Sequence, residues 1–193
     1  MKITSQSTCG TIVHIEDNGR IQIARMTYEK KGRTSIRHIM ESGKNGQTIL
    51  QTLTEGVLKE GAKDRMDFPM SLLSLEPILI EFSNDEKNPG GIHIKTAFPV
   101  FVSEDKLRDV EAKDGDNHDE LHGPITMVDI NDLLYETEGK TVPFHYRVTR
   151  SVLVWAATNP KVLDHYYSLI ASWIPTSLTD EQRAAIEAYP GKW

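Results

Sequence analysis

Cysteine is almost absent from this chain of 193 residues, in which Cys9 is the only one. A single cysteine excludes a disulfide within the chain and any zinc site built from several thiolates. No window approaches the roughly 20 consecutive apolar residues that a membrane-spanning helix needs, and residues 1–7 lack the apolar run of a secretion signal. We therefore expect a cytoplasmic protein with no membrane contact.

An excess of basic charge is also missing. The chain has 22 Lys and Arg against 28 Asp and Glu, and its formal net charge is −6. A nucleic-acid-binding surface has to neutralise phosphates, so we do not expect nucleic acid as a partner. The composition, 38% hydrophobic and 26% charged, is that of an ordinary globular protein, and the length suits one domain over residues 1–193.

Several motifs with known chemistry do not occur. Gly-x-Ser-x-Gly is absent, so there is no nucleophile elbow. The glycine-bearing loop at residues 43–47 lacks the lysine of a phosphate-binding loop, because Gly46 is followed by Gln47 and Thr48. A calcium-binding EF-hand loop counted from Asp114 has Asp119 where position six requires glycine. These patterns therefore assign no function.

Strand patterns dominate the first two thirds of the chain. Residues 11–40 read as a β-meander with a tight turn at residues 17–19. A polar loop joins residues 78–82 to residues 92–102 as a second hairpin. Apolar residues at helical spacing between positions 48 and 59 predict one helix across the sheet.

The last third reads as helical, over residues 145–189. Asn159 followed by Pro160 is a favoured helix start, and residues 179–182 form a capping box. Because helices follow strands instead of alternating with them, we predict an α+β fold. Its antiparallel sheet, the N-terminal meander plus the second hairpin, is covered by one helix and followed by a C-terminal block of about three helices. Residues 1–135 are then mainly β, with one or two helices.

The loop at residues 113–123 holds the densest group of potential metal ligands. Carboxylates and imidazoles suit a divalent metal such as zinc or manganese, and the candidate ligands are Asp114, Asp116, His118 and His122. The two histidines have the four-residue spacing of His-Glu-x-x-His, but Asp119 stands in the place of the glutamate. The alternative interpretation is a charged surface loop without metal.

Aromatic and basic residues gather at two further places. They predict a groove that holds a ligand ring, lined by His145, Tyr146, Arg147 and His165. The plainer interpretation is a packing seam between sheet and helices. His14 and His93 lie inside apolar strand patterns, where we expect structural, hydrogen-bonded histidines.

The helix that begins at Pro160 carries more apolar side chains than a single stripe needs. A second copy of the chain would cover the excess, so we predict a homodimer. The candidate interface residues are Tyr166, Tyr167, Trp173 and Trp193.

No complete catalytic constellation can be written from these residues. The predicted function is therefore a binding or regulatory protein without catalysis and without a cofactor, which acts through a protein or small-ligand surface and self-associates. The alternative is a small metal-dependent hydrolase that uses the loop at residues 113–123.

Overall fold

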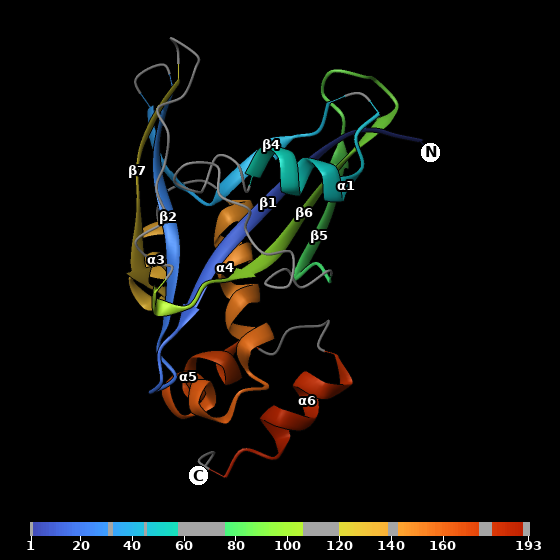
Figure 1. The fold of residues 1–193 in the computed structure, drawn as a ribbon. Helices are drawn as coiled ribbons and strands as arrows, with labels where there is room; N and C mark the ends of the chain where they lie inside the picture. Colours follow the sequence, from blue (N-terminus) through green and yellow to red (C-terminus); the bar gives the residue numbers. More distant parts are fainter. Residues whose placement is uncertain are drawn as a thin grey trace.

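The computed structural model describes residues 2–30, 33–44, 46–57, 76–105, 120–138, 143–173 and 179–190. These residues form one mixed seven-stranded sheet with helices on both faces, as Figure 1 shows. The predicted α+β class is confirmed.

Two neighbouring strands at the centre of the sheet run in the same direction. The strands are β1 (Lys2–Ile15), β2 (Ile21–Lys30), β3 (Arg33–Arg37), β4 (Ile39–Ser42), β5 (Leu79–Asn84), β6 (Gly91–Phe101) and β7 (Glu120–Asp129). Every described pair is antiparallel except β1 with β6, which is parallel along its length. A parallel pair needs a long crossover connection, and residues 16–90 supply it, so the sheet is mixed where we predicted an antiparallel one. The predicted hairpin of β5 with β6 is confirmed.

β1 and β2 diverge beyond their shared turn. They pair only where Val13–Ile15 meets Ile21–Ile23. In the gap that opens, β3 pairs with β2 and β4 pairs with β1. His38 is the single residue that joins β3 to β4, and only 2% of it is exposed.

Helices cover the two faces of the sheet in a consistent order. In Figure 1, α1 (Ile49–Gln51) and the π-helical η1 (Thr52–Val57) lie in front of the sheet, and α3 (Ile130–Glu138) and α4 (Pro143–Ala156) lie behind it. α5 (Pro160–Ser172) and α6 (Asp180–Glu187) lie below. The helix predicted at residues 48–59 is confirmed as far as residue 57, and the Thr48 side chain caps it by accepting from the backbone N–H of Gln51.

The C-terminal helical block is confirmed, with two differences. α4 begins at Pro143, earlier than the apolar pattern indicated, and α3 was not expected as a separate helix. The predicted caps are present: the Asn159 side chain accepts from Lys161 N, and the Thr179 side chain accepts from Gln182 N.

Alternating side chains of the central strands supply two separate cores. On the front face, Ile12 and Val100 pack with Leu53 of η1. On the rear face, Val13 packs with buried residues of α4 and α5, among them Val152. Each such side chain contributes about 1.5–3 kcal/mol when it is fully buried, so both helical layers are anchored to the sheet.

The turn between β5 and β6 is organised by the carboxylate of Asp85. It accepts hydrogen bonds from Thr4 Oγ1 at 2.7 Å, Asn88 Nδ2 at 2.8 Å, Ser5 Oγ at 2.8 Å and Lys87 N at 2.9 Å. These donors favour the charged form, so the hydrogen bonds from Thr4, Asn88 and Ser5 hold the pKa of Asp85 well below its ordinary value. The hairpin is thereby tied to the start of β1.

None of the helices in the described ranges is long and apolar enough to cross a membrane.

Candidate functional site

The front face of the sheet beside η1 is the most developed candidate site. Leu53 is fully buried and fixes η1 on the sheet. Gln6 of β1 adds a polar anchor, since its Nε2 donates to the carbonyl of Gln47 at 2.7 Å and to Thr52 Oγ1 at 3.3 Å. A Cβ atom at Gly43 would lie 2.5 Å from Gln6 Nε2 and 2.9 Å from Thr52 Oγ1, so a larger residue there would displace these two side chains.

Glu41 places a carboxylate on this face. It lies opposite Thr8 in the pairing of β4 with β1, and directly opposed residues share a face of the sheet. Thr8 lies four residues before Ile12, which packs against η1, so Glu41 faces the same side. Its side chain is half-buried, and within the described ranges its carboxylate has no hydrogen-bond or ion-pair partner. Sequence reasoning missed Glu41 because its neighbours Ser42 and Gly43 read as loop.

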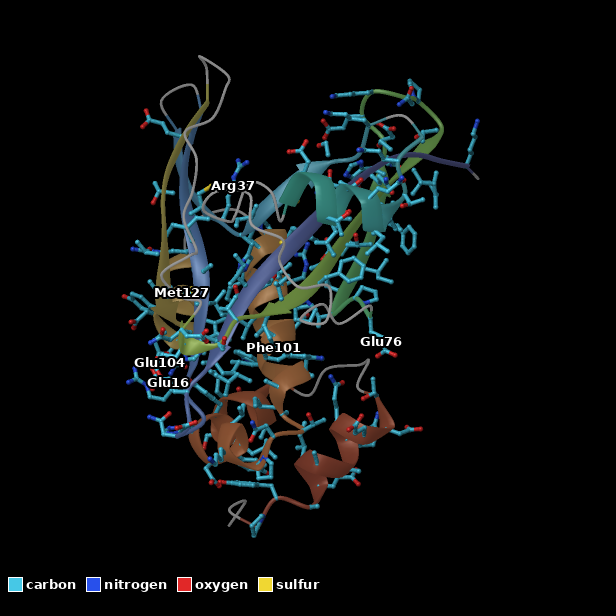
Figure 2. The ribbon with its side chains drawn as sticks, in the orientation of Figure 1. Glu16, Arg37, Glu76, Phe101, Glu104 and Met127 are labelled. Atoms are coloured by element: carbon cyan, nitrogen blue, oxygen red, sulfur yellow. The ribbon has the colours of Figure 1, made fainter. Side chains whose placement is uncertain are left out.

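Apolar side chains continue the face toward β7. Ile125 and Met127 are half-buried and pack against the same core as Leu53, and Figure 2 shows Met127 on the arm formed by β2 and β7. A surface of this kind can hold a flat ring, while a carboxylate beside it can take up a proton or bind a cation.

The described residues do not complete a metal site. No three His, Cys, Asp or Glu side chains come together in the part of the chain that the structure describes. The described residues therefore supply single candidate ligands, such as Glu41, but not by themselves a full set for a divalent cation. A cysteine nucleophile is also excluded, because burial raises the pKa of the Cys9 thiol to about 12.

The predicted metal loop is only partly described. Asp114, Asp116 and His118 lie outside the described residues. His122 lies on β7, opposite Tyr28 of β2. That pair is near the end of the β2–β7 arm at the top of Figure 1. Because the other three predicted ligands lie outside the described residues, the metal-loop hypothesis stays a prediction.

The residues predicted to line one groove are separated. His145 is 2% exposed, and its Nδ1 accepts from the backbone N–H of His38 at 3.2 Å. Arg147 forms an ion pair with Glu81 of β5. His165 is exposed on α5, with its ring centroid 6.0 Å from that of Tyr166.

Tyr146, the fourth of these residues, is half-buried, and the Arg150 guanidinium lies 5.9 Å from its ring centroid. The four side chains therefore do not form one groove in the described structure.

His145 instead belongs to a buried pair with His38. The Nε2–H of His38 donates to Thr149 Oγ1 at 3.0 Å, and that hydroxyl donates to the carbonyl of His145. Burial lowers the pKa of His38 to about 4 and lowers the pKa of His145 well below its ordinary value. Both imidazoles are therefore neutral, and they join α4 to the bend between β3 and β4.

The histidines expected to be structural are hydrogen-bonded. His14 Nδ1 lies 3.0 Å from the carbonyl oxygen of Val102, and His93 Nδ1 lies 2.7 Å from Ser5 Oγ.

The predicted interface residues make contacts within their own chain. Tyr166 is 4% exposed, and its hydroxyl accepts from Ile21 N at 3.0 Å. Tyr167 stacks on Tyr189 with 4.7 Å between ring centroids. Trp173 lies under the guanidinium of Arg150. Trp193 lies outside the described residues.

Comparison with known proteins finds similarity in structure only. No protein-family model matches the chain, and no curated protein sequence matches it. The NUDIX domain of Shewanella oneidensis NrtR, complexed with ADP ribose, has a TM-score of 0.52 at 9% identity, over 79% of this chain and 88% of that one. A C. elegans Ap4A hydrolase has a TM-score of 0.52 at 11% identity, over 80% and 98%. The Nudix hydrolase RenU of M. smegmatis has a TM-score of 0.52 at 9% identity, over 80% and 88%. The chain is similar to these proteins in fold.

This similarity corrects two predictions. A binding protein without catalysis is contradicted, because the structures that share the fold include hydrolases. The expectation of no cofactor is contradicted as well, because Nudix hydrolases need divalent metal ions such as Mg or Mn. The hydrolase alternative fits the fold better. The sequence offered a hydrolase only as the alternative and did not indicate the likeness to Nudix hydrolases, because that likeness lies in the arrangement of strands and helices, at about one identical residue in ten.

Proposed function

We propose that the protein is a hydrolase that cleaves a phosphoanhydride in a substrate with two organic groups joined through phosphates. The observation that carries the proposal is the fold, a mixed sheet with helices on both faces, whose overall arrangement is similar to that of solved hydrolases. The paired organic groups come from the names of the neighbours, of which one is complexed with ADP ribose and one is an Ap4A hydrolase.

In the proposed reaction on ADP-ribose, the oxygen of water bonds to one phosphorus and the bridging P–O bond breaks. AMP and ribose 5-phosphate leave, and one proton is released to a base or to solvent. Nudix hydrolases carry out their chemistry with divalent ions such as Mg or Mn, which neutralise phosphate charge.

Two features of the front face support this reaction. The half-buried carboxylate of Glu41 is available to accept a proton from water or to bind a cation, and the apolar surface at Ile125 and Met127 suits a flat ring. We assign Glu41 to the reacting end of the site and the apolar surface to substrate binding.

The test is hydrolysis of ADP-ribose and of Ap4A by the purified chain with Mg²⁺ or Mn²⁺. We expect release of AMP, measured by anion-exchange chromatography, and loss of that release when EDTA is added. Glu41→Gln removes the proposed base, so we expect kcat to fall about 100-fold, the typical contribution of general-base catalysis.

Glu86→Gln is the matched control, because Glu86 is an exposed glutamate on the β5–β6 turn. We expect it to retain full activity. If neither substrate is cleaved with either metal, the proposed function is contradicted. If both variants keep full activity, the role of Glu41 is contradicted and the reaction is retained.

We also propose that the chain self-associates in the cytoplasm. Tyr166 is buried in its own core. The exposed apolar side chains of Ile80 and Phe82 on the edge strand β5, and of Ile3 at the start of β1, therefore support this proposal better than α5 does. Sedimentation as a monomer at all micromolar concentrations would contradict it.

A further inference from the structure

A cavity of about 450 Å³ lies on the side of the molecule away from η1. It is open to solvent on one side and is lined by residues 76–79 at the start of β5, by α4, by the end of α5 and by the start of α6. Its volume is within the range of small-molecule sites. None of its lining residues belongs to the front face on which the proposed hydrolase site lies.

Arg150 gives this cavity a positive charge in a defined position. Its guanidinium carbon lies 4.3 Å from the centroid of the Trp173 ring, and both side chains line the cavity. Stacking on an indole ring holds the planar guanidinium in place while its N–H groups keep their hydrogen-bonding capacity. Among the described residues, Arg150 makes no ion pair with a carboxylate.

The remaining lining separates into a polar part and an apolar part. In the polar part, Arg147 is oriented by both carboxylate oxygens of Glu81, and Ser151 lies one residue after Arg150 on α4. The polar part also includes one carboxylate, that of Glu76, and the uncharged side chains of Thr179 and Gln182. The apolar part consists of Ile78, Leu79, Val154 and Trp155. A guanidinium binds phosphate oxygens through paired N–H groups, and an apolar wall with a tryptophan favours a flat ring.

We propose that this cavity is a second ligand site, which binds a monophosphate ester that carries a flat ring. Arg150 binds the phosphate, Ser151 adds a hydroxyl donor, and the apolar wall holds the ring. The site is separate from the proposed hydrolase site, so the proposal stands whether or not the chain cleaves ADP-ribose. Because hydrolysis of such a substrate releases ring-bearing monophosphates, the cavity would bind a product of that reaction away from the site where it forms.

Intrinsic tryptophan fluorescence tests the proposal directly. The chain has three tryptophans, and Trp155 and Trp173 both line the cavity, so Trp193→Phe leaves a signal from the cavity alone. Titration of this variant with AMP, without metal, should change the emission and saturate. Adenosine and inorganic phosphate should each bind more weakly than AMP, because each lacks one of the two recognised parts.

Arg150→Gln should weaken AMP binding about 10-fold or more, the usual consequence of losing a hydrogen bond to a charged group. Arg150→Lys keeps the charge without the planar fork and should give a smaller loss. Arg183→Gln is the matched control, because Arg183 is exposed on α6 and does not line the cavity. Thermal melts of all variants identify any that fail to fold.

Saturable AMP binding that falls in the order wild type, Arg150→Lys, Arg150→Gln supports the proposal. Three results would overturn it: no change in emission with AMP, equal affinity in folded Arg150→Gln, or inorganic phosphate binding as tightly as AMP.

Discussion

Replacing Gly19 with alanine should destabilise the protein by roughly 2–5 kcal/mol. Gly19 lies in the turn between β1 and β2 and has a φ of +91°, where an L-residue costs about 1–2 kcal/mol. A Cβ atom there would also lie 2.2 Å from the carbonyl oxygen of Lys161 in the first turn of α5. Because that atom belongs to the backbone, α5 itself would have to move.

The consequence extends beyond the turn, because this contact is where the hairpin meets the helical block. Tyr166 of α5 accepts from Ile21 N, and Arg20 forms an ion pair with Asp129 at 2.8 Å beside it. Displacing α5 therefore disturbs the rear core as well. Urea unfolding followed by circular dichroism should show a lower midpoint for Gly19→Ala.

Gly90→Ala is the control that separates the cost of a positive φ from the cost of the contact with Lys161. Gly90 has a φ of +82°, but nothing lies within 4 Å of the position its Cβ would take. It should therefore cost only the backbone term, about 1–2 kcal/mol. Equal losses of stability in the two variants would contradict the close packing of the turn against α5.

The free energy of unfolding should fall as the pH drops from 6.5 to about 4, because His38 and His145 are buried and neutral. The folded-state pKa of His38 is lowered to about 4 by burial, and that of His145 is lowered in the same direction. The unfolded chain takes up protons near pH 6.5 while the folded chain does not, so acid favours unfolding. For His38 alone the loss approaches roughly 3 kcal/mol at pH 4.

The pH window distinguishes this effect from that of Asp85. The pKa of Asp85 is lowered from an ordinary value near 3.8, so its contribution is complete above that pH and is lost only below it. A decline between pH 6.5 and pH 4.5 therefore reports the histidines whose pKa burial lowers, which are His38, His145 and the partly buried His93.

His38→Gln should reduce the steepness of this decline. Glutamine keeps an amide donor for Thr149 Oγ1 but takes up no proton. His165→Gln is the control, since His165 is exposed on α5, and its pH dependence should match that of the wild type. Urea titrations at pH 7, 6 and 5 give the comparison. If the free energy of unfolding of His38→Gln falls with pH as steeply as that of the wild type, His38 does not contribute to the loss of stability in acid.

The turns, helix starts and caps could be predicted from the nearby residues of the sequence. Turn and cap residues act within a few positions of themselves, so the turn at residues 17–19, the Asn159–Pro160 helix start and the capping box at Thr179 could all be predicted. The same holds for the β5–β6 hairpin, whose polar loop is short. The α+β class followed from the order of these elements.

Only the tertiary structure decided which strands pair with each other. The parallel pairing of β1 with β6 joins segments about 90 residues apart, and no local signal specifies the partner of a strand that is buried on both faces. Pro99 of β6 pairs with β1 alone. It lies at an edge position of β6, because β5 reaches only to the pairing of Leu79 with Ala97.

The side-chain chemistry depended on that pairing. His145 was predicted to line a groove or a seam between sheet and helices, but no local signal showed that α4 packs it against His38, which comes from the bend between two strands. Glu41 reads as part of a loop, yet pairing with β1 places it beside η1. Trp173 and Arg150 are 23 positions apart, yet the turn from α4 into α5 stacks one on the other. Local chemistry therefore determined the elements, and long-range packing determined which side chains share a site, because packing depends on shape and burial that no short stretch of sequence contains.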